Sequence, residues 1–255
     1  MTGKILAVAQ NTFRESVRDK VLYVLLFFAA TAILGSKALG WISIGQDIKI
    51  VKDISLSAIS VFGVLIAIFV GTNLVYKEVD KRTIYTILSR PLHRFEFILG
   101  KYLGLAALLG VVTISMAVVA AAYVLTLGGT VDTTFAIAVA LTYVELLLIT
   151  AFSVLLSTAA SPILGALVVF SIYVVGHATN ILIDLPPHFD DTFARRVMEL
   201  VYYILPNLSN LNVRAEAANE VAVAWAYVGW ATAYGLFYTA VVLALAALAF
   251  EDKDV

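Results

Sequence analysis

Long apolar runs alternate with short polar segments along the whole chain. Six of these runs reach or exceed the roughly 20 residues that a helix needs to cross about 30 Å of hydrocarbon. Runs of this length predict transmembrane helices rather than the amphipathic helices of a soluble core. The predicted spans are Val21–Gly40, Ile54–Tyr76, Phe97–Leu127, Thr133–Ser157, Pro162–Ile183 and Ala222–Phe250.

Short links between the spans predict which of them are neighbours. The links Gly128–Asp132 and Thr158–Ser161 are so short that spans three, four and five should pack as antiparallel neighbours. Ser161 followed by Pro162 is typical of a helix N-cap and a first helical position.

The longest link, residues 184–221, predicts a re-entrant helical loop on the outer side. Its apolar stretch Val197–Leu205 is only about half the length of a span, and Pro206 and Asn207 then break it. We expect a short helix that dips into the membrane, a turn, and an amphipathic return. Non-helical backbone at that depth is tolerated only where protein covers it.

The first 20 residues predict an amphipathic helix that lies on the cytoplasmic membrane surface and contacts lipid. Arg14 and Arg18 fall on the polar face of a helical wheel. A simpler interpretation, a positively charged flank for span one, stays open. The apolar face groups Ile5, Leu6, Ala9, Phe13 and Val17.

The segment between spans two and three, residues 77–96, is the most basic part of the chain. It combines positive charge with an apolar surface at helical spacing, and Pro91 ends that helix. An apolar face in the cytosol needs a cover, so we expect a soluble partner to dock there. The predicted docking residues are Lys81, Arg82, Thr83, Ile84, Tyr85, Ile87, Leu88 and Arg90.

Basic residues also predict the orientation, because membrane proteins keep Lys and Arg on the cytoplasmic side. An even number of spans places both termini on one side. With both termini in the cytoplasm, eleven of the 17 Lys and Arg residues are cytoplasmic and six lie outside. We therefore expect an all-α, multi-pass membrane protein with cytoplasmic termini, organised as one transmembrane domain over residues 1–255.

Composition excludes several classes of chemistry. The chain is 62% hydrophobic with a net charge of −1, so nothing indicates a nucleic-acid partner. It has no cysteine, and its three histidines are too scattered for a metal site. No phosphate-binding loop of the GxxxxGK[ST] type is present, and no hydrolase motif either. The chain is therefore not expected to be an enzyme.

Glu145 is the residue inside a span that most needs a role, because a charge there is costly. One interpretation places it in a translocation path or gate, with His177 as its partner. The other makes it a structural glutamate bonded to Thr142, Tyr143 or a hydroxyl of another span, since polar contacts between spans are common. The aromatic residues that begin the last span predict a belt at the membrane surface.

The order of these features resembles the permease subunits of ABC transporters of the ABC-2 type. Within them, it is similar to the subgroup that includes the nitrous-oxide-reductase maturation permease. The resemblance spans nearly the whole chain and is most specific over Gly71–Gly104. Its motifs are Tyr76-Lys77-Glu78, Arg82-Thr83, Leu88-Ser89-Arg90-Pro91 and Gly100-Lys101-Tyr102-Leu103-Gly104.

The resemblance implies a type V exporter-like fold in a prokaryotic cytoplasmic (inner) membrane. Such permeases dimerise and bind two copies of a separate ABC ATPase, so ATP and magnesium would reside on that partner. Glu78–Arg90 would include the coupling helix, and Lys4–Lys20 would be the connecting helix.

Two functional classes stay open. The chain is either the permease of an exporter or a non-transporting membrane subunit that passes ATP-driven motion to a periplasmic protein. The spans hold few ionisable groups, which argues against a permanent aqueous pore. In both classes we expect span two to continue as a rigid helical lever through Tyr76–Ser89.

Overall fold

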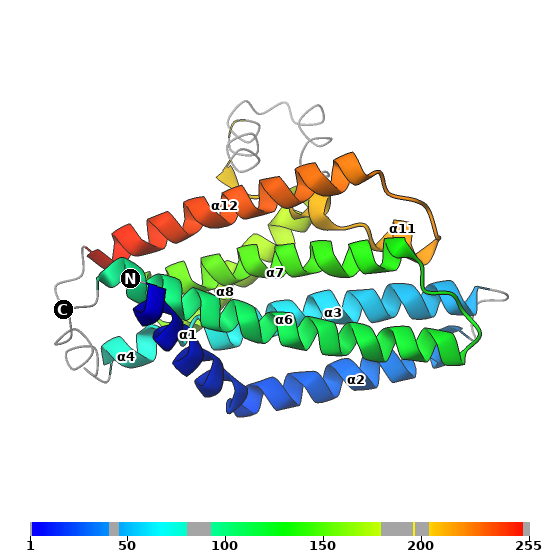
Figure 1. Cartoon of the computed structure of the whole chain (residues 1–255), viewed down its shortest axis with the longest axis horizontal. Coiled ribbons are helices and arrows are strands. Elements are labelled where there is room, and N and C mark those ends of the chain that lie inside the picture. The colour runs from blue at the N-terminus through cyan, green and yellow to red at the C-terminus, as the bar shows by residue number, and fades with distance from the viewer. Residues whose placement is uncertain (1, 41–45, 81–92, 180–195, 197–203, 252–255) are drawn as a thin grey trace.

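The computed structural model describes residues 2–40, 46–80, 93–179, 196 and 204–251, and its described secondary structure is helical throughout. Five of the described helices are long and apolar enough to cross a membrane, and they form one elongated bundle (Figure 1). They are α2 (Lys20–Gly40), α3 (Asp47–Gly71), α6 (Arg94–Thr126), α7 (Thr133–Ala159) and α12 (Trp225–Glu251).

These five helices coincide with five of the six predicted spans. The remaining span corresponds to α8, Pro162–His177, whose 16 residues extend about 24 Å. The last residues of that predicted span, 180–183, lie outside the described part of the chain. Five spans are thus supported by length and composition, and the sixth stays a prediction.

Helix α7 is the centre of the bundle. It packs against α12, α3, α6 and α8, and its side chains are buried on most sides, with Leu141, Leu146, Leu148 and Ile149 each 0% exposed. The predicted antiparallel packing of spans three to five is confirmed. The α6–α7 turn uses Gly128 at φ +80°, a left-handed conformation that only glycine adopts readily.

Helix α3 differs from the prediction at both ends. It starts at Asp47, seven residues before the predicted Ile54. Within this added part Lys52 is buried and pairs with Glu220, whereas Asp47, Lys49 and Asp53 are exposed. At the other end the α-helix stops at Gly71. A turn over residues 72–75 precedes a separate short helix, α4 (Tyr76–Asp80). Span two therefore does not continue as one unbroken helix into the lever that we expected.

Side chains explain the break after Gly71. The Thr72 hydroxyl and the Asn73 amide donate to the carbonyls of Ile68 and Phe69, four residues back. Such local bonds compete with the regular ladder. The buried Val75 N–H donates instead to Ser157 Oγ of α7, at 3.0 Å, so the interrupted backbone is still satisfied.

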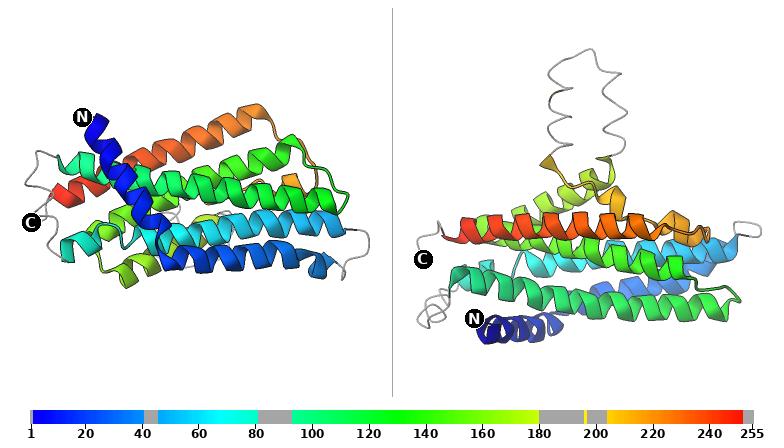
Figure 2. Two further views of the ribbon diagram at one scale, coloured as in Figure 1. Left: turned by 60° about the horizontal axis from the view of Figure 1, so that its bottom comes forward. Right: turned by 45° about the horizontal axis from the view of Figure 1, so that its top comes forward.

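The N-terminal helix α1 (Thr2–Val17) lies across α6 near one end of the bundle (Figure 2). Gly100 and Gly104 of α6 permit this approach. A Cβ on Gly104 would lie 2.5 Å from the Ala9 carbonyl oxygen and 2.6 Å from Thr12 Cβ. The face of α1 that meets α6 includes Ala9 of the predicted apolar stripe, together with the buried Thr12 and Ser16 beside that stripe. Leu6 of that stripe is 70% exposed.

The described second half of the outer loop, residues 204–221, is here named the return segment. It contains the 3₁₀ helix η2 (Leu208–Leu211) and the short helix α11 (Arg214–Ala218). Leu208, Leu211 and Ala217 are each 0% exposed, and the segment packs on α3, α7, α8 and α12. The sequence predicted an amphipathic return, and the described segment lies against protein. The dip into the membrane stays a prediction, and the helix expected at residues 197–205 lies almost wholly outside the described residues.

Candidate functional site

A cluster of polar side chains lies in the middle of the bundle, around Glu145 of α7. Glu145 lies 12 residues after the start of α7, about 18 Å from that helix end, and is 1% exposed. Its Oε1 lies 3.4 Å from Nε2 of His177, at the end of α8. Ser60 of α3 lies beside the Glu145 carboxylate. The cluster thus joins α3, α7 and α8.

The predicted partners of Glu145 can now be compared. His177, proposed from the sequence, does lie against it. The Tyr143 hydroxyl donates instead to the Ala106 carbonyl of α6, at 3.0 Å. A hydroxyl of another span was the third alternative, and Ser60 of α3 is such a hydroxyl beside Glu145. The Ser60 hydroxyl also lies 3.4 Å from the Tyr173 hydroxyl.

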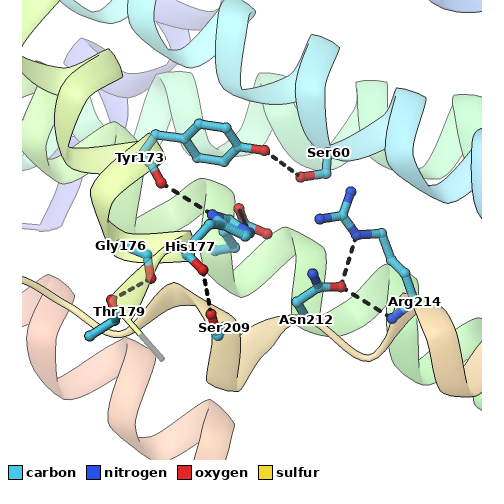
Figure 3. A network of polar contacts seen from close by, with 9 residues as sticks. Ser60, Tyr173, Gly176, His177, Thr179, Ser209, Asn212 and Arg214 are labelled. Atoms are coloured by element: carbon cyan, nitrogen blue, oxygen red, sulfur yellow. Dashed lines mark hydrogen bonds and ion pairs between the residues drawn. The ribbon is translucent and has the colours of Figure 1, made fainter. Parts of the chain in front are cut away.

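Arg214 of the return segment points toward this cluster (Figure 3). Its backbone N–H and Nε both donate to Asn212 Oδ1, at 3.2 and 2.8 Å. These two hydrogen bonds fix the direction of the Arg214 side chain. The charge of Arg214 acts on both Glu145 and His177. The Ser209 hydroxyl adds a second link by donating to the His177 carbonyl at 2.9 Å. Arg214 is one of the six basic residues predicted to lie outside, and its charge acts on the buried glutamate. The sequence did not predict this contact.

Tyrosines of α12 satisfy the non-helical backbone of the return segment. Buried backbone groups need hydrogen-bond partners within the protein, and three tyrosine hydroxyls supply them along one face of α12. This role was missed, because aromatic residues at a span end predict only a membrane belt. The pairs are Tyr238 with the Ile204 carbonyl, Tyr234 with the Asn207 N–H and Tyr227 with the Asn210 carbonyl.

An ion pair closes the outer end of the return segment. Lys52 of α3 is 0% exposed and donates to Glu220 Oε1 at 2.7 Å, and the Thr130 hydroxyl donates to the same oxygen at 2.6 Å. These hydrogen bonds, from Lys52 first and then Thr130, lower the pKa of the Glu220 carboxyl. The return segment is thereby fixed at both the middle and the outer end of the bundle.

A second buried cation lies near the opposite end. Lys101 of α6 is 1% exposed, and its Nζ donates to Glu78 of α4. The same Nζ lies 3.8 Å from Glu15 Oε2 of α1 and 5.6 Å above the ring of Phe97. Lys101 therefore connects α1, α4 and α6. We call Glu15, Glu78 and Lys101 the cytoplasmic joint, after the orientation predicted from the sequence.

Both ends of the predicted docking segment are anchored. The joint holds α4, which precedes residues 81–92. Arg94, which follows them, donates to the Phe250 carbonyl of α12 at 2.8 Å and lies 5.7 Å from the centre of its ring. Phe250 also stacks on Phe97, with ring centres 5.8 Å apart. A force on this segment would reach α1, α6 and α12.

The roles predicted for the other site residues stay predictions. On α1, Phe13 is half-buried, and Arg14 and Arg18 are exposed. No group of three or more potential metal ligands occurs within the described ranges. The docking residues Lys81, Arg82, Thr83, Ile84, Tyr85, Ile87, Leu88 and Arg90 lie outside the described residues.

Comparison with known proteins gives the family. No curated protein matches the chain. A family model described as ABC-2 family transporter protein matches residues 6–255, which is nearly the full length. That match agrees with the five described helices that are long and apolar enough to cross a membrane. The chain belongs to the ABC-2 family of transporter proteins.

Proposed function

We propose that this chain is the membrane permease of an ATP-driven exporter, in which a separate ABC ATPase docks on the cytoplasmic segment, residues 77–96. The observation that carries the proposal is the pair of anchors at the ends of that segment. Lys101 holds its beginning to α6 and α1, and Arg94 holds its end to α12. A segment held in this way can pass motion into the bundle.

The proposed mechanism is rigid-body motion of packed helices. When two ATPases close on ATP and magnesium, the docking segments of two permease copies move with them. The cytoplasmic joint passes this motion to α6 and α1, while the turn at residues 72–75 lets α4 change direction relative to α3. Alternating access by such rearrangement is common among switching proteins. Two copies of each chain suit the symmetry of an ATP-closed ATPase pair.

The alternative is a non-transporting subunit that passes the same motion to a periplasmic protein. It is favoured by the closed bundle middle, where Glu145, His177 and Ser60 face one another rather than an open path. Nucleotide-stimulated movement of a solute across vesicles containing the whole complex would support the exporter. A complex that hydrolyses ATP and moves none would support the alternative.

Co-purification of the ATPase tests the docking proposal. Replacing Ile87 or Leu88 by Asp would bury an unpaired carboxylate in the partner's groove, at a cost of about 3 kcal/mol or more, or about 100-fold in affinity. The tagged Ile87→Asp and Leu88→Asp chains should insert normally yet lose the ATPase. Ile87→Val and Leu88→Met, which keep the surface apolar, are matched controls and should retain it.

Full retention of an active ATPase by both Asp variants would rule out docking on this surface. Mass measurement of the complex in mild detergent tests the stoichiometry at the same time. We expect two permease copies and two ATPase copies, whereas one of each would contradict the dimer.

A further inference from the structure

The contact between Glu145 and His177 contains a hydrogen-bonding conflict. His177 Nδ1 lies 3.2 Å from the Tyr173 carbonyl oxygen, which can only accept, so Nδ1 carries a hydrogen. In a neutral imidazole, Nε2 is then an acceptor. Nε2 faces Glu145 Oε1 at 3.4 Å, and an ionised carboxylate also only accepts. Two acceptors facing one another repel.

No other described group resolves this conflict. Glu145 Oε1 and His177 Nε2 are both buried, and neither receives a hydrogen bond from any residue that the structure describes. Two buried acceptors without a donor are unfavourable in a low-dielectric interior. A single hydrogen between the two atoms would satisfy both of them, whichever atom it is bonded to.

We propose that Glu145 and His177 form a proton-binding site in the middle of the bundle, and that this conformation holds one proton between Oε1 and Nε2. The proton comes from water and returns to water, and no other bond changes. The proposal does not depend on ATPase docking or on transport.

The surroundings link this site to the return segment. The titratable or charged groups that face the pair are Tyr173 on α8 and Arg214 on α11, while α3 contributes the neutral Ser60 hydroxyl. On α12 the Tyr234 hydroxyl accepts a hydrogen bond from the Asn207 N–H of the return segment. The Arg214 guanidinium favours an ionised carboxylate and so opposes the proton. Since linkage is reciprocal, binding the proton weakens the hold of Arg214 on the cluster.

The variant Glu145→Gln tests the site, because its amide N–H₂ is a permanent donor to Nε2. The native state binds the proton more tightly than the unfolded chain does. The proton therefore stabilises the fold at low pH, and this stabilisation is lost as the pH rises above about 6.5, the ordinary pKa of histidine. The melting temperature of the wild-type chain in detergent should therefore fall by several degrees toward alkaline pH relative to that of Glu145→Gln.

Arg214→Gln gives an independent test. Because this variant lacks the cation that opposes the proton, its melting temperature should begin to fall at a higher pH than that of the wild type. Parallel melting profiles for the wild type and Glu145→Gln would overturn the proposal, and so would an unshifted profile for Arg214→Gln.

Spectroscopy of the wild-type chain decides the matter even where a variant fails to fold. At neutral pH, either nitrogen-15 spectra should show His177 as an imidazolium, or infrared spectra should show a protonated carboxyl. His93→Gln and His188→Gln, outside the cluster, assign the histidine signals. A neutral His177 with a bare Nε2 and no protonated carboxyl in the same sample would overturn the proposal.

Discussion

The cytoplasmic joint predicts a large effect for one substitution, Lys101→Met. Methionine keeps the apolar stem of lysine but removes the cation, so the carboxylate of Glu78 is left with 17% side-chain exposure and without that partner. Breaking a fully buried pair costs about 3–5 kcal/mol, and an exposed pair contributes about 1 kcal/mol or less. Glu78 lies between these limits, so we expect a loss of about 2–3 kcal/mol.

Thermal unfolding in detergent measures this loss. At roughly 2–4 °C per kcal/mol for a chain of this size, the melting temperature should fall by about 5–10 °C. Lys77→Met makes the same chemical change at an exposed lysine on neighbouring α4 and should change the free energy of unfolding by less than about 0.5 kcal/mol.

A double variant separates the charge pair from simple packing. Lys101→Met combined with Glu78→Met replaces both ions by apolar groups, which is often close to neutral in a buried pair. It should recover most of the lost stability. The reasoning is refuted if Lys101→Met has the same melting temperature as Lys77→Met. It is also refuted if the double variant loses as much free energy of unfolding as Lys101→Met and Glu78→Met lose together.

Two further predictions concern other contacts. Gly104→Leu should separate α1 from α6 at a cost of about 1–3 kcal/mol and expose α1 to protease, whereas Gly229→Leu, with open space around its Cβ position, should not; equal protease resistance would contradict the packing. The lowered pKa of Glu220 gives stability that is present near neutrality and lost as pH falls through the acid range; Glu220→Gln should flatten this part of the melting profile, Glu216→Gln should not, and an unchanged Glu220→Gln profile would contradict the pair.

The spans could be predicted because length and hydropathy alone decide whether a helix can cross a membrane. The partners of buried charges could not. Lys52, Lys101 and Arg214 each pair with, or act on, an acid far away in the chain, and nothing in the local pattern identifies that acid. The early start of α3 at Asp47 has the same origin, since Lys52 appears as a loop residue until Glu220 is placed beside it.

The break in span two was missed for a different reason. Residues 72–75 are compatible with a continuous helix by composition, and the turn depends on Ser157 of α7, which accepts the Val75 N–H. The burial of the return segment was predictable in outline from Pro206 and the short apolar stretch before it. Its fixation by the α12 tyrosines was not, because those bonds depend on which face of α12 meets the segment.

The most direct test of the central claim is capture of the ATPase from the cytoplasmic segment. The chain has no cysteine, so a single Leu88→Cys can carry a thiol-linked photo-crosslinker in the assembled complex. Lys49→Cys, exposed at the other end of the bundle, is the matched control. We predict that the ATPase is captured from position 88 and not from position 49. An active complex that yields no ATPase adduct at position 88, or equal adducts at both positions, would contradict the claim.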